Sequence, residues 1–403
     1  MTSNTYRIKD VCSRFSSGKS ISANEIHEDG SYPVFGGNGL RGYTDKYNFD
    51  GECVIIGRQG AYCGNVRYFS GKAYMTEHAI VACATREHDT RFLSYKFALM
   101  DLGRYAGQSA QPGLSVETLS AVEITLPPLN VQKKIAKVLS EIDAKIDNNN
   151  AICADLEGMA KLLYDYWFVQ FDFPDKNGKP YKSSGGKMVW NEELKREIPE
   201  GWTVVSYREC IQSVNTGLNP RDNFKLNTGG NIRYLTVKNL TTSGNIDFAS
   251  CDFIDDAARN IVHRRSDISI GDVLFASIAP LGRCFLIDEE PTDWDINESV
   301  FSIRPNYQRM TSKFLYMTFM GDSFIKKATN SSTGSVFKGI RINDLMEMKT
   351  ILPPMSVLQH FDEKVEKLFA TKSNCVAESV ELTSMRDFLL PMLMNGQVKV
   401  KGA

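Results

Sequence analysis

A long helical pattern occurs twice in this 403-residue sequence, and the repeat constrains the fold more than any other feature. In the first copy, apolar and small residues recur at alternating steps of four and three, the spacing of a heptad seam that needs a partner helix. The pattern predicts a helix from Val131 to about Trp167. Its seam positions are Ile135, Leu139, Ile142, Ile146, Asn149, Cys153, Leu156, Ala160 and Leu163.

The second copy follows Leu352-Pro353-Pro354, which repeats Leu126-Pro127-Pro128, and keeps the same steps without a gap. It predicts a helix over 355–395 that ends near Pro391, because proline disfavours continuation of a helix. Asn130 and Ser356 stand where each helix begins, and both are good N-cap residues. The seam positions are Phe361, Val365, Leu368, Lys372, Cys375, Ser379, Leu382, Arg386 and Leu389. The simplest partner for the first helix is the second.

The segments around the helices form two globular blocks. Short apolar runs alternate with Gly-rich turns in residues 1–128 and 202–354, which predicts two mixed, mostly β domains. Within the first block, a helix is expected at about Arg91–Leu102. Residues 129–172 contain the first helix and its exit, and the Gly/Pro-rich segment 173–201 predicts a linker. We therefore expect an α+β tandem repeat of globule plus helix.

The composition is that of an ordinary soluble protein, with 42% hydrophobic and 24% charged residues. The nine cysteines are scattered without a C-x-x-C pair, which favours a reducing compartment. The sequence has no membrane-spanning run and no signal-peptide pattern, so we expect a cytoplasmic protein. Because the net charge is −1, a DNA-binding role would require locally concentrated basic residues or help from partner proteins.

Three enzyme motifs are approached but not completed. Residues 37–42 match G-x-G-x-x-G, but no helical period follows, so a loop is expected. Residues 13–20 resemble a P-loop that lacks its first glycine. Pro174-Asp175 with Glu193 and Lys195 fits a loose nuclease pattern inside the linker. The histidines show no metal-ligand spacing, so neither a catalytic nor a metal site is expected, although a triad assembled across the fold stays open.

Polar loop residues suited to DNA remain after the enzyme motifs are set aside. Arg and Lys match guanine O6/N7, whereas Asn and Gln match adenine N6/N7. The candidates in the first globule are Lys19, Ser20, Asn38, Arg41, Tyr43, Arg58, Gln59, Tyr62, Gln108, Ser109 and Gln111. The candidates in the second are Asn219, Arg221, Lys238, Asn239, Thr241, Arg283, Ser331, Ser332, Thr333, Ser335 and Lys338.

These loops occur at corresponding places in the two globules. Thr76-Glu77 resembles Asn297-Glu298, and the segment from Gly113-Leu114 resembles that from Gly339-Ile340. Arg58 and Gln59 are the preferred base contacts of the first globule, since flanking glycines let the backbone approach DNA closely.

The sequence resembles the specificity (S) subunits of type I restriction-modification systems over nearly its whole length. The resemblance rests on residues 126–135 and their copy at 352–361, and on Tyr166-Trp167-Phe168 followed by 171–174. The segment 177–186, the run 198–202 and the loops 32–39 and 57–62 are similar to that family's connector and target-recognition domains. Lys372, Ser379 and Arg386 depart from an apolar seam and leave the register of the second helix open.

The resemblance implies two target-recognition domains, each reading half of a bipartite double-stranded DNA site. The two helices would pair antiparallel as a spacer and as a docking frame for two methyltransferase (M) subunits, which a restriction/translocase (R) subunit can join. S-adenosylmethionine and ATP are then expected on those partners, with no cofactor in this chain. The chain would supply sequence choice and no catalysis.

Two other function classes stay open at this stage. A stand-alone DNA methyltransferase or nuclease would need a catalytic constellation, and a protein-binding scaffold would have no affinity for DNA. For the favoured class, a helix of this length spans about 55 Å at 1.5 Å per residue. We therefore expect an asymmetric target with half-site centres about one DNA turn apart.

Overall fold

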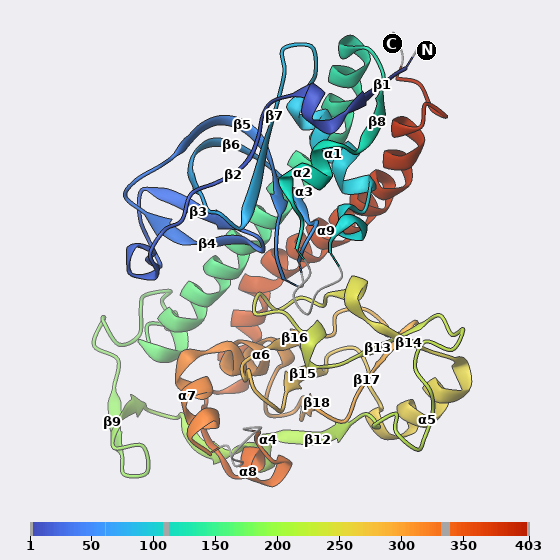
Figure 1. Ribbon diagram of the computed structural model, residues 1–403. Helices are drawn as coiled ribbons and strands as arrows, with labels where there is room; N and C mark the ends of the chain where they lie inside the picture. The colour runs from blue at the N-terminus through green and yellow to red at the C-terminus, as the bar shows by residue number, and fades with distance from the viewer. Residues whose placement is uncertain (1–2, 61, 108–112, 332–338, 401–403) are drawn as a thin grey trace. The chain divides into compact units, whose positions relative to one another are not determined.

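Both long helices are present in a computed structural model of the chain, which describes residues 3–60, 62–107, 113–331 and 339–400 (Figure 1). They are α3, Leu129–Tyr164, and α9, Met355–Met394. The first ends slightly before Trp167 and continues as a π-helical turn, Asp165–Val169. Helix α9 ends at Met394, within one residue of the expected limit at 395, and Pro391 lies inside its last turn. A proline so close to a helix end disrupts little of the ladder, and the buried Leu393 and Met394 anchor the turn.

The chain divides into two compact units. Unit 1 consists of residues 1–150 and 375–403, and unit 2 consists of residues 151–374. Each long helix contributes part of its length to each unit. The domain boundaries expected from the sequence, 128/129, 172/173, 201/202 and 354/355, remain predictions based on composition.

The two helices pair antiparallel, as predicted. In unit 1, Asn149 donates from Nδ2 to Glu378 Oε2 at 2.8 Å. In unit 2, Cys153 donates from Sγ to the Lys372 carbonyl oxygen at 3.8 Å. As the residue number increases along α3, the residue number of its contact on α9 decreases, so the two helices run antiparallel. The predicted seam positions on both helices are buried or half-buried.

Charged side chains on the α9 seam are satisfied across the helix pair. Lys372 Nζ lies 2.9 Å from Glu157 Oε1 in unit 2. Arg386 Nη1 lies 3.1 Å from Asp143 Oδ1 in unit 1. Because each cation has one acid at one position on α3, these pairs fix the register that the sequence left open.

Unit 1 is a bent six-stranded sheet with short helices packed against it (Figure 1). The sheet order is β2-β7-β5-β6-β3-β4, and β1 pairs separately with β8. The strands are β1 Asn4–Arg7, β2 Cys12–Ser17, β3 Tyr32–Gly36, β4 Gly39–Thr44, β5 Phe49–Gly57, β6 Val66–Met75, β7 Ala79–Ala84 and β8 Glu123–Leu126. The helices are η1 Ile8–Val11, η2 Ala23–Glu25, α1 Thr90–Leu99, η3 Leu102–Tyr105 and α2 Val116–Ser120. The helix expected at 91–102 is thus α1, whose N-cap Asp89 accepts from the Phe92 N–H.

Unit 2 divides its strands between two principal sheets, β12-β18-β15-β16 and β14-β13-β17. Its strands are β11 Thr203–Ser206, β12 Ile211–Thr216, β13 Ile232–Leu235, β14 Asp252–Ile254, β15 Val273–Ala276, β16 Cys284–Leu286, β17 Trp294–Ile296, β18 Val300–Pro305 and β19 Lys349–Leu352. Its helices are α4 Tyr207–Cys210, η5 Val237–Asn239, η6 Phe248–Ser250, α5 Asp256–Ser266, α6 Ser312–Met320, α7 Asp322–Ser331 and α8 Ile342–Glu347. Helix α5 is inserted between β14 and β15, where unit 1 has only a short turn between β4 and β5.

Strand registers support the tandem duplication. Strand β1 pairs antiparallel with β8 in unit 1, and β11 pairs antiparallel with β19 in unit 2. Both units contain one parallel pair, in which Phe35 faces Met75 and Leu235 faces Ile296. Register irregularities follow Cys12 in β2 and Ile211 in β12. The mixed, duplicated α+β fold expected from the sequence is therefore confirmed.

Each unit buries the exit of a long helix in its core. After α3, Trp167 and Phe168 pack in the core of unit 2, where the Phe168 ring lies 4.9 Å from the Phe361 ring. Near the end of α9, Leu393 and Met394 pack in the core of unit 1. When the two Leu-Pro-Pro motifs are aligned, Trp167 matches Leu393 and Phe168 matches Met394.

The segment interpreted as a linker carries local structure. It contains the hairpin β9 Met188–Asn191 and β10 Arg196–Pro199. Phe173 stacks on Tyr181 with ring centroids 4.7 Å apart. Its Gly and Pro residues therefore accompany tight turns and a hairpin, all within unit 2.

Candidate nucleic-acid interface

Loops that follow different strands converge in unit 1. The Arg58 N–H donates to the His78 carbonyl at 2.9 Å, and the Lys19 N–H donates to the Met75 carbonyl at 2.9 Å. A Cβ added at Gly37 would lie 3.1 Å from the His78 oxygen and 3.3 Å from the Gln59 oxygen. We call this region, formed by residues 17–20, 36–41, 57–60 and 76–78, the unit 1 loop cluster.

Arg58 is partly turned into the protein rather than fully presented to solvent. Its guanidinium donates to the Leu114 carbonyl at 3.3 Å, and to Ser17 Oγ and the Glu77 carbonyl at 3.4 Å. The side chain is half-buried. Arg58 thus ties together three loops of the cluster, which limits its freedom to make a bidentate base contact.

Gln59 is exposed and held by a neighbouring histidine. His78 Nδ1 lies 2.8 Å from Gln59 Oε1, and His78 Nε2 lies 3.3 Å from Glu77 Oε1. Because an amide oxygen only accepts, His78 donates from Nδ1 to Gln59. No described residue accepts a hydrogen bond from Gln59 Nε2, and such an amide donor suits an acceptor on a base.

The remaining unit 1 candidates divide into three groups. Lys19, Ser20, Asn38, Arg41 and Tyr62 are exposed. Tyr43 lies further along β4, is half-buried, and bridges His27. Gln108, Ser109 and Gln111 lie outside the described residues.

Unit 2 repeats the backbone of the unit 1 loop cluster with different side chains. The Ser277 N–H donates to the Ser299 carbonyl at 3.0 Å, and the Ile340 N–H donates to the Ser277 carbonyl at 2.8 Å. In unit 1 the same two bonds join Arg58 to His78 and Leu114 to Arg58. The position of Arg58 is therefore taken by Ser277, whose hydroxyl is bonded to the Ser299 carbonyl at 2.7 Å.

Asn219 is the candidate placed at this cluster in unit 2. Its Nδ2 donates to Glu298 Oε1 at 2.6 Å, and its Oδ1 is buried without a hydrogen-bond partner among the described residues. Arg221 is exposed two residues further on. Arg283 is half-buried and donates from Nη1 to the Val237 carbonyl at 3.3 Å.

The side chains of three unit 2 candidates make hydrogen bonds or ion pairs with nearby residues of unit 2. Asn239 is fully buried, and its amide bonds Thr236, Asp247 and Ser250, so its assignment as a base contact is corrected to a structural role. Thr241 Oγ1 closes a turn with Asn245, and Lys238 pairs with Asp252 at 3.3 Å. Such local bonds are the common alternative to ligand contact for short polar side chains. Ser331 ends α7, while Ser332, Thr333, Ser335 and Lys338 lie outside the described part of the chain.

Two glutamates were missed among the candidate residues. Glu77 and Glu298 follow β6 and β17 at corresponding positions, and each has one oxygen in a polar contact and a buried Oε2 without a hydrogen bond among described residues. The sequence carried a signal, since Thr76-Glu77 aligns with Asn297-Glu298. A carboxylate can accept from the cytosine N4 amino group, so an acid in such a cluster is compatible with base reading.

The enzyme-like motifs have structural roles. Residues 37–42 belong to the β3–β4 hairpin and not to a strand–helix turn. Asp175 accepts from the N–H groups of Asn177 and Lys179, whereas Glu193 pairs with Lys349. Across the described residues, no group of three His, Cys, Asp or Glu side chains is arranged to hold a metal ion.

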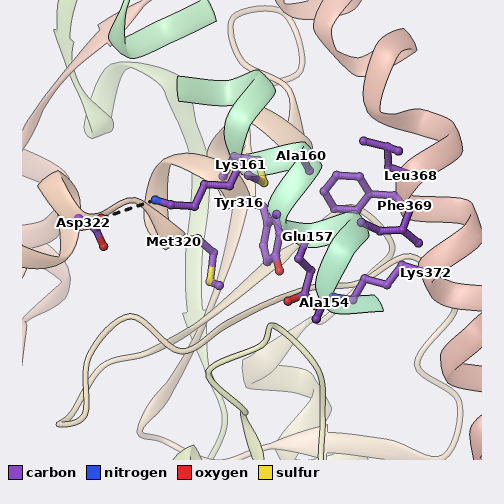
Figure 2. A pocket seen from close by; sticks show the side chains of 13 residues that line it. Ala154, Glu157, Ala160, Lys161, Tyr316, Met320, Asp322, Leu368, Phe369 and Lys372 are labelled. Atoms are coloured by element: carbon purple, nitrogen blue, oxygen red, sulfur yellow. Dashed lines mark ion pairs between the residues drawn. The ribbon is translucent and has the colours of Figure 1, made fainter. Parts of the chain in front are cut away.

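A cavity of about 290 Å³ lies in unit 2 between α3, α6 and α9 (Figure 2). Its lining is mainly apolar and includes Tyr316, Met320 and Phe369. Its charged lining residues form two ion pairs, Lys372–Glu157 at 2.9 Å and Lys161–Asp322 at 3.5 Å. The paired charges and apolar walls are those of a gap between packed helices.

The geometry defines a duplicated α+β protein in which one loop scaffold recurs with different polar side chains. The family described as "Type I restriction modification DNA specificity domain" matches residues 2–158 and 199–371. Since the match covers most of the sequence, the chain belongs to this family. Within the described residues, no helix is long and apolar enough to cross a membrane.

Two curated relatives and one solved structure illustrate the similarity. The EcoprrI specificity subunit of Escherichia coli is 42% identical over 130 residues, 31% of this chain and 32% of that protein. The MjaIX specificity subunit of Methanocaldococcus jannaschii is 27% identical over 332 residues, 77% of this chain and 70% of that protein. The matched region spans about a third of the length of the EcoprrI subunit. The S subunit of a type I restriction-modification system from M. genitalium shares the fold, with a TM-score of 0.60, 17% identity and coverage of 98% and 96% of the two chains.

Proposed function

We propose that this chain is the DNA-reading subunit of a type I restriction-modification complex. Each globule reads one half of a bipartite, asymmetric double-stranded site. The paired helices α3 and α9 act as spacer and as docking frame. The chain makes and breaks no covalent bond.

The observation that carries this proposal is the repeated loop scaffold with unlike side chains. The same two backbone bonds organise residues 58, 78 and 114 in unit 1 and residues 277, 299 and 340 in unit 2. A repeated scaffold with Arg58 and Gln59 in one copy and Asn219 and Ser277 in the other suits the reading of two different sequences. Direct base readout needs few residues, so a net charge of −1 is compatible with partners supplying phosphate contacts.

The proposed partners are two methyltransferase subunits and restriction/translocase subunits. S-adenosylmethionine and ATP would bind to those partners. A stand-alone DNA enzyme and a DNA-independent scaffold are the competing functions, and one experiment separates all three.

The experiment compares DNA methylation in cells and in a reconstituted complex with and without this chain. We expect methylation at one bipartite sequence only when the chain and the methyltransferase subunits are both present. Turnover by this chain alone, abolished by a change in its own loops, would establish a stand-alone enzyme. A complex that lacks salt-dependent affinity for duplex DNA would favour a scaffold.

The spacer role makes a separate prediction. Helix α3 has 36 residues, and at 1.5 Å per residue it spans about 54 Å. Deleting one heptad from each helix, in register, keeps the seam and shortens the pair by about 10 Å. The preferred gap in the DNA site should shrink by up to about three base pairs, at 3.4 Å each. The measurement is methylation of a duplex series with varied gaps, and an active deletion variant that keeps the original gap would contradict the spacer role.

A further inference from the structure

A hollow of about 510 Å³ opens in unit 2 beside the C-terminal turn of α5. Figure 1 shows α5 in unit 2, and this helix has no counterpart among the described residues of unit 1. The hollow is lined by Asn215, Asn260, His263, Arg264, Arg265 and Asp267. Cationic and amide side chains dominate this lining.

The two arginines of the hollow, Arg264 and Arg265, have no acidic partner among the described residues. Asp267 is already paired with Arg304, whose Nη1 lies 3.1 Å from Asp267 Oδ2. Arg264 is exposed and forms no hydrogen bond or ion pair with any described residue. Arg265 is exposed too, and only its Nε is engaged, at 3.3 Å from Thr216 Oγ1. Its terminal guanidinium nitrogens are therefore available to a ligand.

The hollow is attached to strands of the candidate interface. Arg265 bonds Thr216 at the end of β12, one residue before Gly217 and three before Asn219. His263 Nδ1 lies 3.1 Å from Asp295 Oδ2, and Asp295 is a fully buried residue of β17, the strand that precedes Glu298. Two strands that lead into the unit 2 loops thus hold the basic end of α5.

Basic residues in a last helical turn also have an ordinary explanation, since they interact favourably with the helix C-terminus. That explanation requires no hollow and no amides opposite the arginines. It also predicts no effect on DNA affinity. The two explanations therefore differ in a measurable way.

We propose that this hollow is a phosphate site for the DNA backbone, with Arg264 and Arg265 as its cations and Asn215 and Asn260 as amide donors. The proposal rests on the proposed DNA-reading function and extends it to a contact that positions the duplex without reading its sequence. Because unit 1 lacks α5, this contact belongs to the half-site read by unit 2.

The test uses the full chain in complex with its methyltransferase subunits and duplexes that contain or lack the methylated site. The double variant Arg264→Gln with Arg265→Gln should weaken binding to both duplexes by similar factors. The slope of log K against log salt should fall in magnitude by about 0.9 for each lost phosphate contact, which is roughly eightfold in affinity at 0.1 M salt relative to 1 M.

The control is Arg208→Gln with Lys187→Gln, which removes the same charge from unit 2. These cations are already paired, Arg208 with Glu347 at 2.8 Å and Lys187 with Glu200 at 2.6 Å. The control should keep the wild-type salt slope. Arg264→Lys with Arg265→Lys should also retain most of it, because charge is preserved.

Each outcome has one meaning. If the wild-type complex binds no DNA, the proposed function fails. If it binds and the Gln variant keeps the wild-type slope, the phosphate site is wrong and the function stands. A change confined to the site-containing duplex would make the arginines base readers and overturn the proposal. If the double variant fails to assemble, single Arg264→Gln decides by the same slope, since Arg264 has no described partner to lose.

Discussion

The loop cluster of unit 1 and its counterpart in unit 2 have the same backbone bonds and different side chains. In unit 1, Arg58 bridges three loops and His78 holds Gln59. In unit 2, Ser277 occupies the bridging position and Asn219 is held by Glu298. The backbone bonds of the scaffold therefore do not depend on any particular side chain. Side chains can then change to suit a different half-site while the loops remain in place.

The largest test of this comparison removes unit 2. A fragment of residues 1–175 keeps the first globule, all of α3 and its exit, including Trp167 and Phe168. These two residues correspond to Leu393 and Met394, which pack in the core of unit 1. A second copy can therefore supply what α9 supplies in the intact chain, and we expect a homodimer. With methyltransferase subunits, it should methylate a symmetric site made of two copies of the first half-site.

Sedimentation at micromolar concentration measures the association of this fragment. A fragment ending at residue 150 lacks the second half of α3 and its exit, and should stay monomeric. A monomeric 1–175 fragment would show that the two helices are not interchangeable partners.

The helix exits offer the next largest effect. Trp167→Ala should destabilise unit 2 by about 3–5 kcal/mol, because removal of the indole ring leaves a cavity among Phe168, His360 and Phe361. Leu393→Ala should destabilise unit 1 by about 2–5 kcal/mol. All four tryptophans lie in unit 2, so fluorescence reports on that unit. Denaturant unfolding followed by fluorescence should shift with Trp167→Ala, and hydrogen exchange should locate the Leu393→Ala effect in unit 1. Equal protection changes in both units for either variant would mean that they unfold as one.

Arg58→Ala should affect the first half-site and spare the second. We expect a cost of about 1–3 kcal/mol in binding, because the change removes a guanidinium that holds three loops of the candidate interface in place. Binding of the complex to duplexes altered in one half-site at a time measures the effect. Ser277→Ala, at the equivalent position, should alter preference only in the second half-site. Unchanged binding by Arg58→Ala would show that this residue plays no part in reading the first half-site.

The smallest expected effect concerns pH. Burial raises the pKa of Asp362 to about 6, while Thr311 Oγ1 donates to its carboxylate at 3.0 Å. The folded pKa exceeds the unfolded value of about 3.9. Stabilisation from the neutral acid is therefore fully present below about pH 3.9 and is lost as the pH rises through about 6.

Asp362→Asn should remove this loss and stabilise unit 2 at pH 7–8 by about 1–2 kcal/mol, after allowance for partial exposure. In unit 1, the long helix contacts the N-cap of α1 through a neutral side chain, since Gln132 Oε1 accepts from the Asp89 N–H at 3.0 Å. Fluorescence-monitored unfolding at pH 5 and pH 8 checks the difference. Equal stabilisation by Asp362→Asn at both values would contradict the titration.

Sequence alone predicted the elements that are governed by local periodicity. The seam from Ile135 to Leu163 follows a heptad spacing that can be read from one contiguous stretch of the sequence. The same holds for its copy in α9. The loops obey no such rule. Arg58 turns inward because Ser17, Glu77 and Leu114 supply acceptors from distant parts of the chain. Asn239 is buried because its loop folds around it, although its residue type suits base contact.

The composition of unit 1 from residues 1–150 and 375–403 has a consequence for biosynthesis. The first globule leaves the ribosome before Leu393 and Met394, which complete its core, have been made. Synthesis of the intervening residues 151–374 takes roughly 10–45 s at about 5–20 residues per second. During that interval, Ile135, Leu139 and the surface that Leu393 later covers lack their permanent partner. The first globule is therefore the part of the nascent chain with the longest exposure to chaperones and proteases, and slower translation of 151–374 should reduce the yield of folded protein.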